Sequence, residues 1–187
     1  MADPADLLRD AALVARARAG EQGGYAELMR AHRAAVFRLC RHHVGDEHEA
    51  LDLTQETFAA AFAALTRFDP ARSFRAWILR IAVNKCHDWA RRRAVRRFFT
   101  FAQPLDAALE LAAPAMPLDD ALAAKQAVER MRGAIAALPA ALKEPLILCA
   151  IEGMSQAEAA QVLGVGEKAV ETRIYRAKRR LAEMLRD

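Results

Sequence analysis

The chain has 187 residues, which is enough for one large domain or two small ones. Hydrophobic residues account for 54% of it, aromatic residues for only 6%, and glycine for 8 positions, so the composition favours helices and argues against an all-β fold. The net charge of +4 conceals two basic segments, Arg91–Arg97 and Arg173–Arg180, and one acidic segment, Asp46–Glu56, which together indicate a nucleic-acid ligand and a protein partner.

The sequence shows no sign of export or of a resident metal. An acid, Asp3, stands where a signal peptide would be basic, and no apolar run approaches about 18 residues. The three cysteines, Cys40, Cys86 and Cys149, are odd in number and lie far apart without metal-ligand spacing. We therefore expect a soluble, cytoplasmic protein with reduced structural cysteines, no membrane insertion, no metal and no cofactor.

Four helices are expected in the first half of the chain. Apolar spacing and breaks place them at Asp6–Ala19, at Tyr25–Val44, at Glu47–Thr66, and from a Ser73 cap to Ala90 or beyond. Gly20, Gly23 and Gly24 are expected to end the first helix. Three histidines near the next turn, His42, His43 and His48, are interpreted as solvated.

The expected third helix carries a polar face. Glu49, Asp52, Gln55 and Glu56 recur at i, i+3, i+6 and i+7, so they share one side of the helix. This pattern is typical either of an ordinary solvated face or of an acidic ridge that docks on a basic partner. The spacing alone leaves both interpretations open.

The expected fourth helix combines a core stripe with a basic end. Phe74, Trp77, Ile78 and Ile81 follow the helical period and predict core positions. The pattern loosens over residues 82–86, which predicts an interruption between two helical pieces. Trp89 and the arginines after it suit contact with phosphates and an unpaired strand, although a solubilising helix end would have the same composition.

Residues 98–117 read as a flexible linker between two helical domains, at residues 6–97 and 118–187. Periodicity fails there, and Pro104, Pro114 and Pro117 interrupt any helix. A linker of about 20 residues spans about 65 Å when fully extended, so the two basic segments can lie far apart on a long ligand.

The second domain is expected to hold four short helices and to end in a helix-turn-helix. Pro145 is placed in the first turn of one helix, and Ser155 and Glu158 form a capping box before another. In the last helix, Glu167–Leu185, one face is apolar, and the opposite face carries cationic and hydrogen-bonding side chains. This arrangement suits a recognition helix in the DNA major groove. The apolar face consists of Val170, Ile174, Ala177 and Leu181. The opposite face consists of Lys168, Thr172, Tyr175, Arg176 and Arg179.

Three segments, taken together, resemble the extracytoplasmic-function (ECF) sigma factors, the small two-domain class of bacterial RNA polymerase sigma subunits. Residues 52–58 (DLTQETF) are similar to the family's D-x-x-Q-E-x-F stretch, and residues 74–84 (FRAWILRIAVN) to its F-x-x-W-L-x-x-I-A-x-N stretch. The third segment runs from Leu138-Pro139 to Arg173-Ile174-Tyr175-Arg176-Ala177. The resemblance spans about Leu13 to Leu185.

The resemblance implies a role for each surface. The family docks its acidic helix on core RNA polymerase, which points to Asp52, Gln55 and Glu56. Its melted −10 promoter element is held by an asparagine and by the basic residues that follow, which points to Asn84, Lys85, Arg91, Arg92 and Arg93. Its last helix reads the −35 duplex, which points to Lys168, Thr172, Arg173, Arg176 and Arg179.

The sequence departs from the family pattern at three places. Lys143-Glu144-Pro145 replaces the usual Arg-Glu-Val, and Gly166 is a weaker helix cap than the usual serine or threonine. Glu171 stands where many relatives have a basic residue, so the promoter sequence does not transfer.

These observations predict an all-α, non-enzymatic initiation factor whose partners are core RNA polymerase, promoter DNA and an anti-sigma protein. No Gly-rich phosphate loop and no paired acid–base carboxylates appear in the sequence. Two alternatives stay open. One is a stand-alone helix-turn-helix regulator, which would bind an operator without polymerase. The other is a sigma mimic that titrates an anti-sigma protein, which would not need the basic segments.

Overall fold

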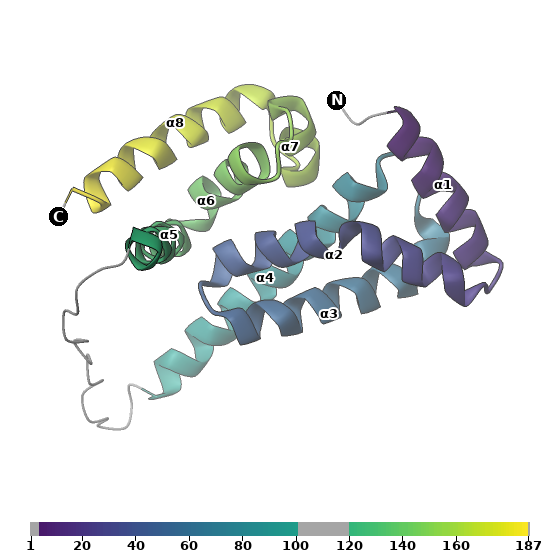
Figure 1. Ribbon diagram of the computed structural model, residues 1–187, viewed down its shortest axis with the longest axis horizontal. Helices are drawn as coiled ribbons and strands as arrows, with labels where there is room; N and C mark the ends of the chain where they lie inside the picture. The colour runs from purple at the N-terminus through teal and green to yellow at the C-terminus, as the bar shows by residue number, and fades with distance from the viewer. Residues whose placement is uncertain (1–3, 101–119, 187) are drawn as a thin grey trace.

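The computed structural model describes residues 4–100 and 120–186, and within these ranges every regular element is helical. The helices form two units (Figure 1). The first unit contains α1 (Pro4–Arg18), α2 (Gln22–Val44), α3 (Glu47–Ala63), a short 3₁₀ turn (Leu65–Arg67) and α4 (Phe74–Thr100). The second contains α5 (Asp120–Ala137), α6 (Ala140–Leu146), a π-helical turn (Ile147–Ile151), α7 (Gln156–Leu163) and α8 (Glu167–Met184). The predicted all-α class is confirmed.

The expected linker, residues 98–117, lies largely outside the described residues. Its first three positions, however, belong to α4, which continues to Thr100. Among the described helices, none combines the length and the hydrophobicity that crossing a membrane requires.

In the first unit, α2, α3 and α4 pack against one another, and α1 packs on one end of this bundle (Figure 1). Its largest fully buried side chains are Leu28, Leu39, Leu53, Phe58, Leu65, Phe74, Ile78 and Leu79. Gly23 and Gly24 were expected to end the first helix, but both lie inside α2. A Cβ on Gly24 would stand 2.6 Å from the backbone N of Ala17, so only glycine lets α1 and α2 approach this closely.

The expected interruption after Ile81 was wrong, because α4 is continuous through residues 82–86. Ala82, Val83 and Cys86 are all buried, so the apolar stripe continues at helical spacing with smaller residues. The Ser73 hydroxyl accepts a hydrogen bond from the backbone N of Ala76 at 3.2 Å, which confirms it as the cap of α4. One rigid helix therefore runs from the core of the first unit into its basic end.

The second unit has the expected four α-helices, and α8 follows its predicted pattern. Val170, Ala177 and Leu181 are buried against the rest of the unit, with Ile174 partly buried beside them. The predicted capping box at α7 is also confirmed, since Ser155 and Glu158 each accept a hydrogen bond from the other's backbone N–H.

Substituting Ser155 with alanine is expected to lower the free energy of unfolding by about 1 kcal/mol. The change removes the acceptor for the backbone N–H of Glu158 at the start of α7. Chemical denaturation of the two proteins measures the difference. Ser155→Asp is the control, because aspartate caps helices as well as serine does; an equal loss in both variants would contradict a capping role.

The placement of Pro145 in a first helical turn was wrong. α6 begins at Ala140, so Pro145 lies inside it, directly before the π-helical turn. Proline has no N–H to donate to the carbonyl four residues earlier, which weakens the α-helical ladder at this point. The chain continues with a wider turn, in which the backbone N of Glu152 donates to the carbonyl of Ile147 at 3.0 Å.

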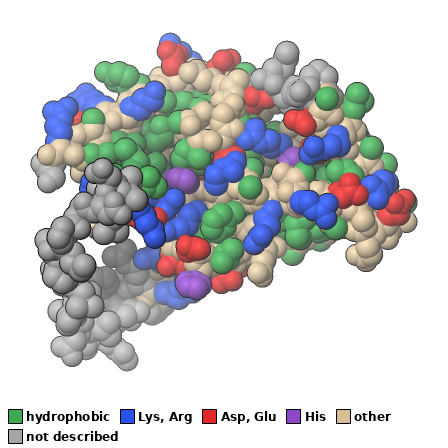
Figure 2. Space-filling model, viewed as in Figure 1, with side chains coloured by type: hydrophobic (Ala, Val, Ile, Leu, Met, Phe, Trp, Pro, Cys, Tyr) green, Lys and Arg blue, Asp and Glu red, His purple; other side chains and the backbone are tan. Residues whose placement is uncertain are grey.

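The two units are in contact along one side of the first bundle. α5 and α6 lie against α2, and α7 lies against α4, whereas α8 packs on α5, α6 and α7. In Figure 1, α8 consequently lies on the side of the second unit that is turned away from α2–α4. Acidic, basic and histidine side chains appear between the two layers in Figure 2. We call this arrangement the closed form.

Candidate nucleic-acid interface

The exposed face of α8 carries the residues expected to read duplex DNA. Lys168, Thr172, Arg176 and Arg179 are exposed, and Arg173 is half-buried. Lys and Arg side chains are visible along the edge of the molecule formed by α8 (Figure 2). This face is cationic and rests on a buried apolar stripe, which is the arrangement that a helix needs to enter a major groove.

Several of these side chains already have partners within α8. Lys168 pairs with Glu171 at 2.7 Å, Arg179 pairs with Glu183 at 3.3 Å, and the Thr172 hydroxyl donates to the Lys168 carbonyl at 2.9 Å. Exposed pairs of this kind contribute only about 0–1 kcal/mol and exchange readily for phosphate. Glu171, the departure from the family pattern, therefore offsets the charge of Lys168.

The candidate residues for melted DNA lie along α4. Asn84 is exposed and shares a helix face with Asp88 and Arg91, at i, i+4 and i+7. Asp88 pairs with Arg91, so this face is less positive than the arginine run suggests. Arg91, Arg92 and Arg93 are all exposed.

Trp89 is not the exposed aromatic side chain that the sequence suggested. It is 8% exposed, and its Nε1 donates to Glu49 at 2.7 Å. The Arg93 guanidinium lies 5.1 Å from its ring, in a cation–π contact. Trp89 therefore anchors α4 on α3 and orients Arg93, and it is not available to stack on a base.

The residues on the polar face of α3 divide into two groups. Asp52 and Gln55 are exposed, as a docking surface requires. Glu56 instead faces α4, where it lies 3.4 Å from Lys85 and 3.8 Å from Arg92. The candidate polymerase-binding and −10-binding residues are thus in direct contact through Glu56.

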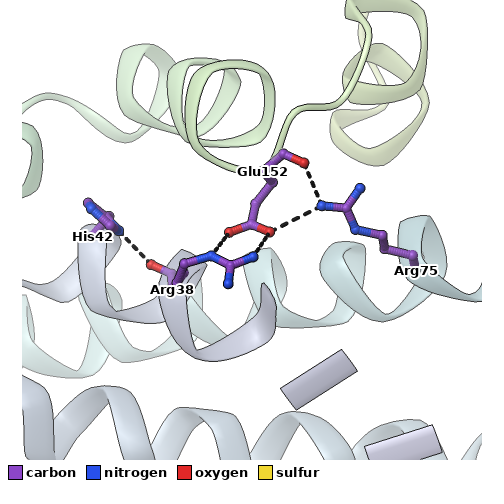
Figure 3. A network of polar contacts seen from close by, with 4 residues as sticks. All are labelled: Arg38, His42, Arg75 and Glu152. Carbon is purple, nitrogen blue, oxygen red and sulfur yellow. Dashed lines mark hydrogen bonds and ion pairs between the residues drawn. The ribbon is translucent and has the colours of Figure 1, made fainter. Parts of the chain in front are cut away.

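A buried carboxylate joins the two units at their interface (Figure 3). Glu152 follows the π-helical turn, and its side chain has no exposed surface. It accepts two hydrogen bonds from Arg38 of α2, both at 2.8 Å, and lies 3.2 Å from Arg75 of α4, which also donates to its carbonyl at 2.5 Å. The hydrogen bonds from Arg38 to this carboxylate raise the pKa of the guanidinium.

A second polar cluster lies in the same interface, at the Lys143-Glu144-Pro145 departure. Lys143 donates to the main-chain oxygens of His43 and Ala136, at 2.9 and 2.5 Å. One oxygen of Glu144 lies 3.2 Å from His43 Nε2 and 2.5 Å from His87 Nε2. The interpretation of His43 as solvated was wrong, because it is 3% exposed and burial lowers its pKa. The sequence analysis did not predict that Lys143, Glu144 and His43 contact one another across the interface. The only sign of it in the sequence was the replacement of the family's Arg-Glu-Val by Lys143-Glu144-Pro145.

Comparisons with known proteins assign both units. The family model Sigma-70 region 2 matches residues 28–96, and Sigma-70, region 4 matches residues 129–181. The chain is 39% identical to the RNA polymerase sigma factor CnrH of Cupriavidus metallidurans, over 94% of each chain. It is 36% identical to the ECF RNA polymerase sigma factor SigD of Mycobacterium bovis, over 92% of this chain and 82% of SigD.

The fold agrees with a solved relative. The structure of CnrH in complex with the cytosolic domain of CnrY matches with a TM-score of 0.69 and 35% identity, covering 94% of this chain and 96% of that chain. The matches run through both helical units and through the acidic, basic and helix-turn-helix segments. The chain belongs to the extracytoplasmic-function family of RNA polymerase sigma factors.

Proposed function

We propose that this protein binds core RNA polymerase, directs initiation at specific promoters, and is controlled by an anti-sigma protein in the cytoplasm. The observation that carries the proposal is the similarity to CnrH over 94% of each chain, with regions 2 and 4 in order. The bound CnrY domain in the CnrH structure supports the control by a second protein. Polymerase supplies the chemistry, and this chain supplies recognition.

The surfaces described above support separate roles for the candidate residues. Asp52 and Gln55 dock on polymerase. Asn84, with Lys85 and Arg91–Arg93, holds the melted −10 strand, where bases that have left the stack are captured at a cost of a few kcal/mol. Lys168, Thr172, Arg173, Arg176 and Arg179 read the −35 duplex, where base-pair edges are distinct. Glu56 connects the first two surfaces by positioning Lys85 and Arg92.

The distance between the two promoter elements is about twice the length of the longest described helix. The −10 and −35 elements are about 25 base pairs apart, which is about 85 Å of duplex at about 3.4 Å per pair. The longest helix in the described part of the chain, α4, has 27 residues and is about 40 Å long. We therefore propose that the closed form is inactive and that binding to polymerase separates the two units.

Run-off transcription with core polymerase and a promoter library tests the proposed function. We expect transcripts that depend on the added protein and share two sequence elements. Binding to core polymerase without selective transcripts would contradict promoter recognition. Binding to an operator by the protein alone, without binding to polymerase, would establish a stand-alone regulator instead.

Substituting Asn84 with alanine is expected to lower open-complex formation about 10- to 100-fold without changing affinity for core polymerase. Asn84 is exposed on α4, and loss of its contacts to an unstacked base removes about 1–3 kcal/mol. Permanganate reactivity of the −10 region measures melting. An equal loss of affinity for core polymerase in Asn84→Ala would contradict a role confined to the melted strand.

A further inference from the structure

Three side chains with metal-ligand chemistry converge between the two units. His43 comes from α2, His87 from α4 and Glu144 from α6, and their ligand atoms all lie within 4.8 Å of one another. The same Glu144 oxygen is 3.2 Å from His43 Nε2 and 2.5 Å from His87 Nε2. The cluster spans the interface of the closed form, and its His87 lies one helical turn from Asn84 on α4.

The hydrogen bonds within the cluster set the position of the proton on His43. Nδ1 of His43 is buried without a hydrogen-bond partner in the described part of the chain. Without a metal, Nε2–H of His43 donates to the Glu144 carboxylate at 3.2 Å, so an ion bound at Nε2 requires this proton to move to Nδ1 or to leave. The neighbouring ammonium of Lys143 is held by the main-chain oxygens of His43 and Ala136, which leaves the Glu144 carboxylate to the two imidazoles.

The chemistry of the ligands identifies the class of ion. Two imidazole nitrogens and one carboxylate oxygen suit Zn²⁺ and neighbouring divalent transition metals, whereas Ca²⁺ and Mg²⁺ prefer oxygen ligands alone. His87 is 43% exposed, which gives an ion access from solvent, while the other two side chains are nearly covered. We propose that His43, His87 and Glu144 form a binding site for a divalent transition-metal ion, with Zn²⁺ preferred, that joins the two units.

Because the site lies between the two units, a bound metal ion opposes their separation. The two histidines belong to the first unit and the carboxylate to the second, so separating the units breaks the ligand set. An ion that binds only the closed form stabilises it by RT ln(1 + L/Kd), where L is the free ion concentration and Kd its dissociation constant. At a free concentration 100 times its dissociation constant, the ratio of closed to open form rises about 100-fold.

Titration of the metal-free full-length protein with Co²⁺, followed by competition with Zn²⁺, tests the proposal. We expect one ion per chain and the visible absorption of a four-coordinate Co²⁺ site. His87→Ala is expected to weaken affinity at least about 100-fold, since even outer contacts of metal ligands contribute 10- to 100-fold. His48→Ala, which removes an exposed histidine outside the cluster, is the control and should match the wild type.

Two outcomes would overturn the assignment. One is equal Co²⁺ affinity in wild type and His87→Ala; because this side chain is partly exposed, the variant should fold, and circular dichroism verifies that it does. The other is a thiolate spectrum, which would place the ion on Cys40 and Cys86, whose sulfurs are 3.9 Å apart.

A second measurement tests the link to closure. Saturating Zn²⁺ is expected to raise the Tm of the wild type and to leave that of His87→Ala unchanged. Equal Tm values with and without Zn²⁺ in the wild type would overturn the joining role. Neither readout uses transcription, so a failure here is distinct from a failure of the proposed function.

Discussion

Replacing Asp52 with lysine is expected to lower the affinity for core RNA polymerase about 100-fold and to leave the fold intact. Asp52 is exposed on α3, so its replacement disturbs no internal contact. At a docking surface built for a basic partner, the new charge is repelled, and like charges across an interface cost several kcal/mol. A loss of about 3 kcal/mol corresponds to an affinity about 100-fold lower. Fluorescence anisotropy of labelled protein with core polymerase measures it.

The matched control for this prediction is Glu47→Lys, which makes the same charge change at an exposed position in the first turn of α3. It should retain most of the affinity. Equal losses in the two variants would show a general electrostatic effect and not a specific docking residue. Glu56→Lys is a poor choice for this test, because Glu56 contacts Lys85 and Arg92, and its reversal disturbs the DNA-binding surface as well.

Replacing Glu152 with glutamine is expected to open the molecule and to tighten its binding to core polymerase. Glu152 is the fully buried member of the contact with Arg38 and Arg75. Breaking a fully buried ion pair costs about 3–5 kcal/mol. Because both arginines are partly exposed, we expect the free energy that favours the closed form to fall by only about 2–3 kcal/mol. The ratio of open to closed form should rise about 30- to 140-fold. If only the open form binds polymerase, affinity rises with its population.

Small-angle X-ray scattering of the variant should show a larger radius of gyration, and anisotropy should show the tighter binding. Glu129→Gln is the control, because Glu129 pairs with Arg41 across the same interface but is half exposed, and such pairs contribute little. An unchanged radius in Glu152→Gln would show that the apolar contacts between the units suffice for closure. A weaker affinity for polymerase would show that Glu152 itself is needed in the complex.

The features that the sequence predicted correctly depend on local spacing. The four helices of each unit, the Ser73 and Ser155 caps and the stripe of α8 all rest on residues three or four positions apart. Such neighbours meet on a helix whatever the rest of the chain does. The exposure of Asp52 and Asn84 agrees with their predicted sites, while their roles stay predictions.

The features that the sequence missed depend on distant partners. Arg38 and Glu152 are 114 positions apart, and Lys143 and His43 are 100 apart, so no periodic pattern connects them. Trp89 was expected to contact an unpaired DNA strand because it precedes a run of arginines, yet its indole is buried and donates a hydrogen bond to Glu49 of α3. The histidine interpretation failed for the same reason: the side chain that covers His43 comes from the other unit.

The division of charges at the interface has a consequence for building hybrid sigma factors. The first unit contributes Arg38 and Arg75, and the second contributes Glu152, the acid that pairs with both. A second unit taken from another member of the family would bring its reading helix but not necessarily this acid, and two arginines would then face an unmatched surface. Exchanging promoter specificity by exchanging whole units would therefore also change how readily the molecule opens. A hybrid that keeps its regulation must carry both halves of the interface, or must transfer only the exposed face of α8.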